Sequence, residues 1–103
     1  MNAVKDITWR PAKLKVQPSC LPGAVIEGRT LWMHLNGFAF YSEESLPAGS
    51  KIKAHILFGN TVLVIDGIIA GCTLSGEMGF RIEVSITNSD SSDRLYLKRR
   101  SRS

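Results

Sequence analysis

Two histidines are the first candidates for chemistry in this sequence of 103 residues, and neither has the neighbours that catalysis needs. A catalytic nucleophile requires a base beside a serine or cysteine and a third group that orients the base. His34 lies in an apolar stretch and His55 on the polar face of a predicted strand, with no metal-ligand spacing around either. Glu43 and Glu44 are adjacent loop residues whose carboxylates need not converge. The sequence therefore predicts neither an enzyme nor a protein with a metal or other cofactor.

A small basic cluster near the N-terminus offers anion-binding chemistry instead. Arg10, Lys13 and Lys15 follow Trp9 closely. Charged donors of this kind bind phosphate, and an aromatic ring beside them can stack on a base. The alternative is that these residues form the outward polar face of an ordinary strand. Both interpretations stay open at this point.

The net charge of +4 is concentrated at the C-terminus. Four of the 13 basic residues lie in the tail over residues 98–103, which leaves nine basic and nine acidic residues in the rest. A basic tail can attract phosphate, anionic lipid or an acidic partner, and it can equally be a solvated terminus. The balanced body argues against a protein whose main function is to bind nucleic acid.

Cysteine use and hydropathy indicate a cytoplasmic protein. The N-terminus has no apolar run typical of a signal peptide, and no segment has the roughly 18 apolar residues needed to cross a membrane. Cys20 and Cys72 are far apart and match no metal spacing. We expect reduced thiols, with a disulfide only if the fold brings the two cysteines together.

The elements that must position these groups are strands. Apolar residues alternate with polar ones in short segments between turn residues, which is the pattern of an antiparallel sheet. Predicted strands cover residues 24–35, 38–42, 51–58, 61–72 and 80–86, and a further one runs through Leu14 and Val16. Gly59-Asn60 predicts a hairpin, while Asn36-Gly37 predicts either a hairpin or a glycine kink in one strand. Gly28 is a candidate bulge position.

We expect an all-β fold, a small six-stranded antiparallel barrel, because closure removes exposed sheet edges. Residues 1–22 are predicted to be an N-terminal segment with an edge strand, since Pro11 cannot donate to a sheet ladder. Residues 23–97 hold the barrel and a short C-terminal helix, which the polar residues near Ser91 predict. Residues 98–103 are the basic tail.

The succession of elements resembles the PilZ domain, the bacterial receptor fold for cyclic di-GMP. The resemblance rests on GRTLWMHLNGFAFYSEESLPAGSKIKAHILF, on the hairpin that follows it, and on GFRIEVSITNSDSSDRLYLKR. It covers roughly residues 24–97 and implies a six-stranded barrel with a C-terminal helix. It also implies a role in signalling pathways that control motility, pili or exopolysaccharide, with cyclic di-GMP as the candidate ligand.

The strand motif of the PilZ family is altered in this sequence. Where the family has (D/N)xSxxG, Gly37 matches the glycine. Trp32 stands at the Asp or Asn position, and His34 stands at the serine position. Two polar groups that would contact the nucleotide are therefore missing.

The arginine motif of the family, RxxxR, is altered as well. Arg10 is followed by Lys13, and Leu14 stands at the second arginine. Lysine does not reproduce the bidentate and stacked contacts of arginine. We therefore expect weak or no binding of cyclic di-GMP. The predicted ligand-site residues are Trp9, Arg10, Lys13, Lys15, Trp32, His34 and Gly37.

The sequence predicts a PilZ-like adaptor that acts through contacts with a protein partner. The surfaces expected to make those contacts are the segment around Trp9, the loop over residues 43–49 and the tail. The alternative is a small β-barrel that binds nucleic acid through an aromatic sheet face made by Phe38, Phe40 and Tyr41. Strand alternation places two of these three rings in the core, so nucleic acid is the weaker expectation.

Overall fold

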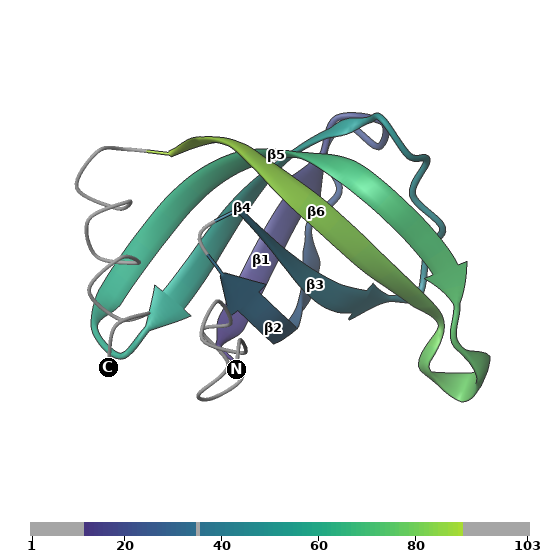
Figure 1. The fold of residues 1–103 in the computed structure, drawn as a ribbon, viewed down its shortest axis with the longest axis horizontal. Coiled ribbons are helices and arrows are strands. Elements are labelled where there is room, and N and C mark those ends of the chain that lie inside the picture. The colour runs from purple at the N-terminus through teal and green to yellow at the C-terminus, as the bar shows by residue number, and fades with distance from the viewer. Residues whose placement is uncertain (1–11, 35, 90–103) are drawn as a thin grey trace, which may run out of the picture.

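The protein is built from six strands and one short 3₁₀ helix in a computed structural model that describes residues 12–34 and 36–89 (Figure 1). The strands are β1 (Lys13–Pro18), β2 (Ile26–His34), β3 (Gly37–Ser42), β4 (Lys51–Phe58), β5 (Thr61–Leu74) and β6 (Phe80–Ser89). The 3₁₀ helix η2 (Gly76–Met78) lies in the turn between β5 and β6. Each strand predicted from alternating apolar residues is present, with ends that differ by a few residues.

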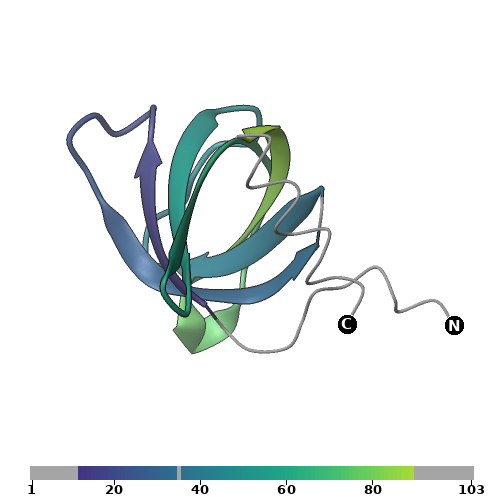
Figure 2. The ribbon, with the colours of Figure 1, turned by 90° about the vertical axis from the view of Figure 1, so that its left-hand side faces the viewer.

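The strands form a closed antiparallel barrel in the order β1-β2-β3-β6-β5-β4, seen as a ring in Figure 2. β1 closes the ring because it pairs with β2 on one side and with β4 on the other. This double pairing corrects the expectation of an edge strand within residues 1–22, since β1 is a full member of the barrel wall. It begins at Lys13, two residues after the proline on which that expectation rested.

Two turns predicted from glycine dipeptides connect neighbouring strands. β4 and β5 pair from Phe58 opposite Thr61 onward, so Gly59-Asn60 forms the expected hairpin. β2 and β3 are antiparallel, with His34 opposite Gly37. Of the two interpretations of Asn36-Gly37, the hairpin is therefore correct, and the continuous kinked strand is wrong.

The core fills the inside of the barrel with one side chain in two from each strand. Phe38 and Phe40 of β3 are fully buried there, and their ring centroids lie 6.1 Å apart. Aliphatic side chains from the other strands surround them. The largest are Val16, Met33, Ile56, Leu63, Ile65, Ile69 and Ile82. Burial of this apolar surface is the main stabilising term for a domain of this size.

Register irregularities bend two of the strands. In β2 the pairing with β3 shifts between Thr30 and Trp32, so the bulge lies at Leu31 and not at Gly28. In the long strand β5 the pairing with β6 shifts near Gly67 and again before Gly71. Such bulges increase the local twist, and this twist lets a small sheet close.

Several expectations fall outside the described residues. The C-terminal helix, the basic tail, Trp9 and Arg10 are among them. Within the described part of the chain both cysteines are free, Cys20 exposed and Cys72 half-buried. That part also contains no helix with the length and hydropathy of a membrane span.

Candidate functional site on the outer face of the barrel

The bulge in β2 directs Trp32 and His34 to the outside of the barrel. Thr30 and Met33 both point into the core, with exposed fractions of 3% and 1%. They are three residues apart, whereas regular alternation would bury residues two apart. The extra residue, Leu31, reverses the alternation. Trp32 and His34 therefore share the outer face at the end of β2.

The rings of Trp32 and His34 form a stacked pair. Their centroids lie 5.1 Å apart and their planes differ by 10°. The backbone N–H of Asn36 donates a hydrogen bond of 3.1 Å to Nδ1 of His34, which fixes the orientation of the imidazole. The two positions therefore present aromatic faces and an anchored ring, and they carry no carboxylate or hydroxyl.

Small residues of β3 lie beside this stacked pair. Trp32 is opposite Ala39 and His34 is opposite Gly37 in the ladder, and both of these small residues are buried. A Cβ atom at Gly37 would lie 2.6 Å from the backbone oxygen of Val84 and 3.6 Å from Cε1 of His34. Only glycine therefore fits at this position, and packing against β6 explains the glycine without any role in ligand binding.

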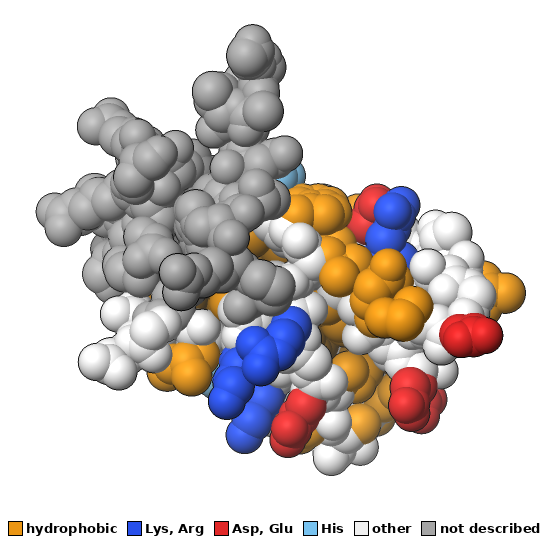
Figure 3. Space-filling model, turned by 90° about the horizontal axis from the view of Figure 1, so that it is seen from below, with side chains coloured by type: hydrophobic (Ala, Val, Ile, Leu, Met, Phe, Trp, Pro, Cys, Tyr) orange, Lys and Arg blue, Asp and Glu red, His pale blue; other side chains and the backbone are white. Residues whose placement is uncertain are grey.

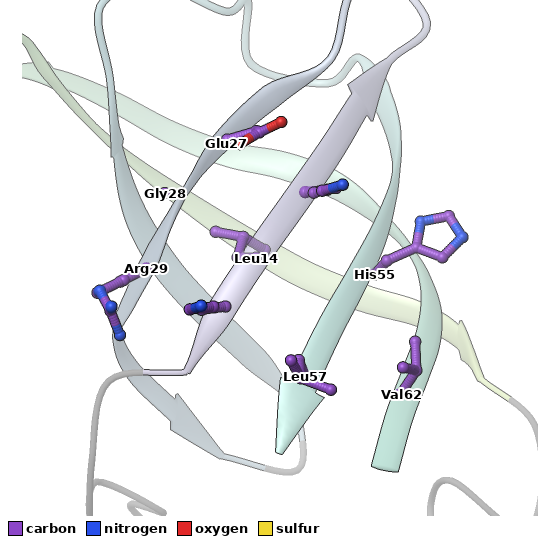
Figure 4. Close-up of a pocket in the computed structure, with 9 residues that line it drawn as sticks. Leu14, Glu27, Gly28, Arg29, His55, Leu57 and Val62 are labelled. Carbon is purple, nitrogen blue, oxygen red and sulfur yellow. The ribbon is translucent and has the colours of Figure 1, made fainter. Parts of the chain in front are cut away.

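The predicted basic residues lie on a different part of the wall. Lys13 and Lys15 point outward from β1, opposite Arg29 and Glu27 of β2. They line a hollow of about 610 Å³, which we call the β1–β4 hollow (Figure 4). Its lining residues are Lys13, Leu14, Lys15, Glu27, Gly28, Arg29, His55, Leu57 and Val62.

The five predicted ligand-site residues that lie in the described part of the chain fall into two groups. Trp32, His34 and Gly37 lie together at the β2–β3 turn, and Lys13 and Lys15 lie in the β1–β4 hollow. Lys15 is opposite Glu27, which lies about 16 Å along β2 from Trp32 at about 3.3 Å per residue, and Lys13 is opposite Arg29, which lies about 10 Å from Trp32. Lys15 lies far from Trp32 because the antiparallel register of β1 and β2 places it opposite the start of β2, whereas Trp32 lies near the end of that strand.

Sequence reasoning missed seven of the nine residues that line the β1–β4 hollow. Among them, Arg29, His55, Leu57 and Val62 were assigned to strands but not to a site. Strand alternation places His55 outward on β4, and this signal was available. The neighbours of His55 across the sheet, Lys15 and Val64, follow only from the register, which the sequence does not show.

The loop over residues 43–49 is held against the barrel at two points. Leu46 is fully buried in the core. The hydroxyl of Ser42 accepts a hydrogen bond from the Glu44 N–H (2.9 Å) and donates one to the Glu44 carbonyl oxygen (2.8 Å). Glu43 and Glu44 contribute to a second, acidic depression of about 390 Å³ that includes Glu27.

The aromatic residues do not form the sheet face that single-stranded nucleic acid would need. Phe38 and Phe40 are fully buried, and Tyr41 is half-buried on the outside. Stacking of bases requires exposed rings in succession. Within residues 12–34 and 36–89 no group of three or more His, Cys, Asp or Glu side chains is arranged to hold a metal ion.

Comparison with known proteins gives no match by sequence. No protein-family model matches the chain, and no curated protein is detectably similar to it in sequence. The fold, in contrast, has clear neighbours among solved structures.

Three solved structures share the fold. The Bacillus subtilis inhibitor of motility (MotI/DgrA) superposes with a TM-score of 0.77 at 10% identity over 89% of this chain, which spans only 46% of that protein. The PilZ domain of Escherichia coli YcgR, solved with c-di-GMP, gives a TM-score of 0.64 at 14% identity over 86% of this chain and 77% of that one. The PilZ domain of CeSA from a cellulose-synthesizing bacterium gives 0.64 at 13% identity over 87% and 88%. This chain therefore has the fold of these PilZ domains.

Proposed function

We propose that this chain is a non-catalytic, cytoplasmic PilZ-like signalling domain that acts in a cyclic di-GMP-linked pathway by contacting a protein partner. Its affinity for cyclic di-GMP itself is weak or absent. The proposal assigns the positions of Trp32, His34 and Gly37 to the remnant of a ligand site. Motility, pili and exopolysaccharide are the processes in which such domains are expected to act.

The observation that carries this proposal is the stacked pair of Trp32 and His34. The rings occupy the positions at which the family motif has Asp or Asn and Ser, and the bulge points both positions outward. The carboxylate and hydroxyl that would contact a nucleotide are replaced by rings packed on each other. Hydrogen bonds to charged groups contribute about 1.5–3 kcal/mol each, so two lost bonds correspond to roughly 3–6 kcal/mol. That loss is about 10²–10⁴ in Kd.

The arginine motif supports the same conclusion. Leu14, which stands at the second arginine, is buried in the barrel with an exposed fraction of 2%. A side chain at this position points into the core and cannot reach a ligand on the outer face. Lys13, one residue earlier, points outward and supplies a cation without the bidentate geometry of a guanidinium.

The structural neighbours support the functional class. One of them is a PilZ domain solved with c-di-GMP, and another is an inhibitor of motility. The shared fold makes cyclic di-GMP-linked signalling the preferred class for this chain. No observation on the described residues favours nucleic-acid binding as a second candidate.

Titration calorimetry of the whole chain with cyclic di-GMP tests the proposal. We expect binding weaker than about 100 μM at moderate salt, that is, a binding free energy smaller than about 5.5 kcal/mol. The same titration on Arg10→Ala identifies any residual contribution of the N-terminal basic residues. Low-micromolar binding that disappears in Arg10→Ala would contradict the proposal, because the protein would then be a working receptor.

A further inference from the structure

The wall around the β1–β4 hollow has a basic half and an apolar half. Over β1 and β2 the outward residues include Lys13, Lys15 and Arg29. Over the β4–β5 hairpin they are Leu57 and Val62, which lie opposite each other and are 38% and 53% exposed. Figure 4 shows Arg29 on one side of β1, with Leu57 and Val62 on the other side.

Among the described residues no ion pair joins Lys13, Lys15 or Arg29 to an acidic side chain, although Lys15 lies opposite Glu27 in the ladder. Lys13 and Arg29 are direct partners across the ladder, a like-charge arrangement that destabilises a sheet. The one ion pair within residues 12–34 and 36–89 joins Arg81 to Glu83, on the other side of the barrel. Figure 3 shows basic side chains gathered in one group with an acidic side chain beside them. An external anion would remove this repulsion.

The apolar half is a surface that water solvates poorly. Leu57 and Val62 form a cross-strand aliphatic pair, and Val64 continues the row with 41% exposure. The hollow extends inward to the core residue Leu14 past Gly28, where no side chain fills the wall. A partner that covers this half therefore needs aliphatic side chains that can enter a recess.

We propose that the β1–β4 hollow is the docking site for an acidic amphipathic helix of a partner protein. This inference rests on the adaptor role proposed above and names the surface and the chemistry of the partner. Carboxylates of the helix would face Lys13, Lys15 and Arg29, and its aliphatic side chains would cover Leu57 and Val62. His55, between the two halves, can donate a further hydrogen bond to a carboxylate.

The dimensions match this occupant. Lys13 and Lys15 are two residues apart on one strand, about 7 Å, while residues four apart on a helix are separated by about 6 Å along its axis. From Lys13 and Lys15 on β1 across β4 to β5 the distance is roughly 10 Å, since neighbouring strands are about 4.8 Å apart, and the long side chain of Arg29 starts one strand further away, on β2. A helix with its side chains is about 10–12 Å wide. One helix can therefore cover both halves at once.

Other occupants fit this surface less well. In a symmetric dimer, Lys13 and Arg29 of one copy would face the same basic residues of the other copy, and the like charges would repel. Among the lining residues, nucleic acid would find only the half-buried ring of His55 to stack on. A membrane surface is bound by a long row of apolar side chains, whereas Leu57 and Val62 are the two aliphatic side chains of the outer wall that line the hollow.

The test uses the whole chain and a labelled synthetic helical peptide of about 18 residues, or five turns. The peptide carries glutamates spaced four residues apart and leucines on the adjacent face. Fluorescence anisotropy gives Kd, and NMR amide shifts locate the contact. We expect shifts at Lys13, Lys15, Arg29 and Leu57, and little binding of a scrambled peptide of the same composition.

Matched variants distinguish specific contacts in each half of the site from general effects of net charge and of surface hydrophobicity. Lys13→Glu should weaken binding of the peptide about three- to tenfold. Lys51→Glu changes the net charge equally at the far end of β4 and should leave Kd within about twofold. Leu57→Ser should weaken binding, whereas Leu74→Ser, at a more exposed leucine near η2, should not.

Three outcomes would overturn the proposal. Equal effects of Lys13→Glu and Lys51→Glu would mean general charge attraction, and equal binding of the scrambled peptide would exclude a helical face. Binding to phosphatidylglycerol vesicles that is lost in Lys13→Glu, with no peptide contact, would assign the face to a membrane. Cyclic di-GMP calorimetry and the peptide titration have separate readouts, so failure here and failure of the proposed function are distinguishable.

Discussion

Two substitutions on β2 should give this barrel a measurable affinity for cyclic di-GMP. Trp32→Asp combined with His34→Ser restores the polar groups of the family motif. The bulge at Leu31 already directs both positions outward, and Gly37 already occupies the glycine position. The double variant therefore completes the strand motif without any change to the backbone path.

The expected gain follows from the contacts that are restored. Two hydrogen bonds to charged groups give roughly 3–6 kcal/mol, which lowers Kd by about 10²–10⁴ relative to the wild type. The cost is the stacked pair and part of the apolar cover over Ala39. Removing a half-buried tryptophan lowers the free energy of unfolding by about 2 kcal/mol, roughly half of the loss at a buried site. A domain with about 5–15 kcal/mol of stability remains folded after that loss.

Calorimetry with cyclic di-GMP on three proteins gives the answer. These are the wild type, the double variant, and Trp32→Ala combined with His34→Ala, with folding checked by circular dichroism during thermal unfolding. The alanine variant removes the rings without supplying polar groups, so we expect it to bind no better than the wild type. If it binds as tightly as the Asp and Ser variant, the rings merely obstruct the site and the hydrogen-bond argument is refuted. A folded double variant with no binding would refute the strand motif as the limiting defect.

Two further predictions concern the barrel itself. Gly67→Ala should lower the free energy of unfolding by about 1–3 kcal/mol in urea denaturation, because its Cβ would lie 2.6 Å from Cγ1 of Val84 and 2.8 Å from a backbone oxygen of β6. Gly71→Ala, on the same strand with its nearest contact at 3.5 Å, is the matched control, and equal losses in the two variants would contradict this steric account. Thr30→Val should cost about 1–3 kcal/mol and speed amide exchange at Ala12, whose N–H donates to the Thr30 hydroxyl at 2.9 Å. Thr30→Ser keeps that acceptor, so an equal loss in the serine variant would assign the effect to packing.

Much of the fold follows from local sequence patterns. Alternation over residues 51–58 requires one buried face, and Gly59-Asn60 requires the chain to reverse, so β4 and β5 are predictable as a hairpin. Closure is predictable from size, because a single small sheet would leave two long edges exposed. The β1 strand is the exception. Pro11, which precedes β1, suggested an edge strand, but the pairing of β1 with β4 on its far side is decided only when the barrel closes.

The candidate site was less predictable, because it depends on register. The sequence placed Trp32 and His34 at motif positions, but the outward orientation of Trp32 results from one extra residue at Leu31. Alternation counted from Thr30 would have buried the indole. No local signal predicts the bulge, since leucine fits a regular strand equally well. The separation of Lys15 from His34 has the same origin, because it follows from how β1 and β2 are paired.

Strand β2 connects the two surfaces that the proposals assign. Arg29 borders the β1–β4 hollow before the bulge, and Trp32 begins the motif positions after it. A ligand that contacts Trp32 or His34 would therefore act on the segment that also positions Arg29. In this chain the stacked rings and the anchored imidazole already hold that segment in place. On the proposed adaptor role, the stacked pair takes the place of ligand groups and supports a docking face that needs no ligand.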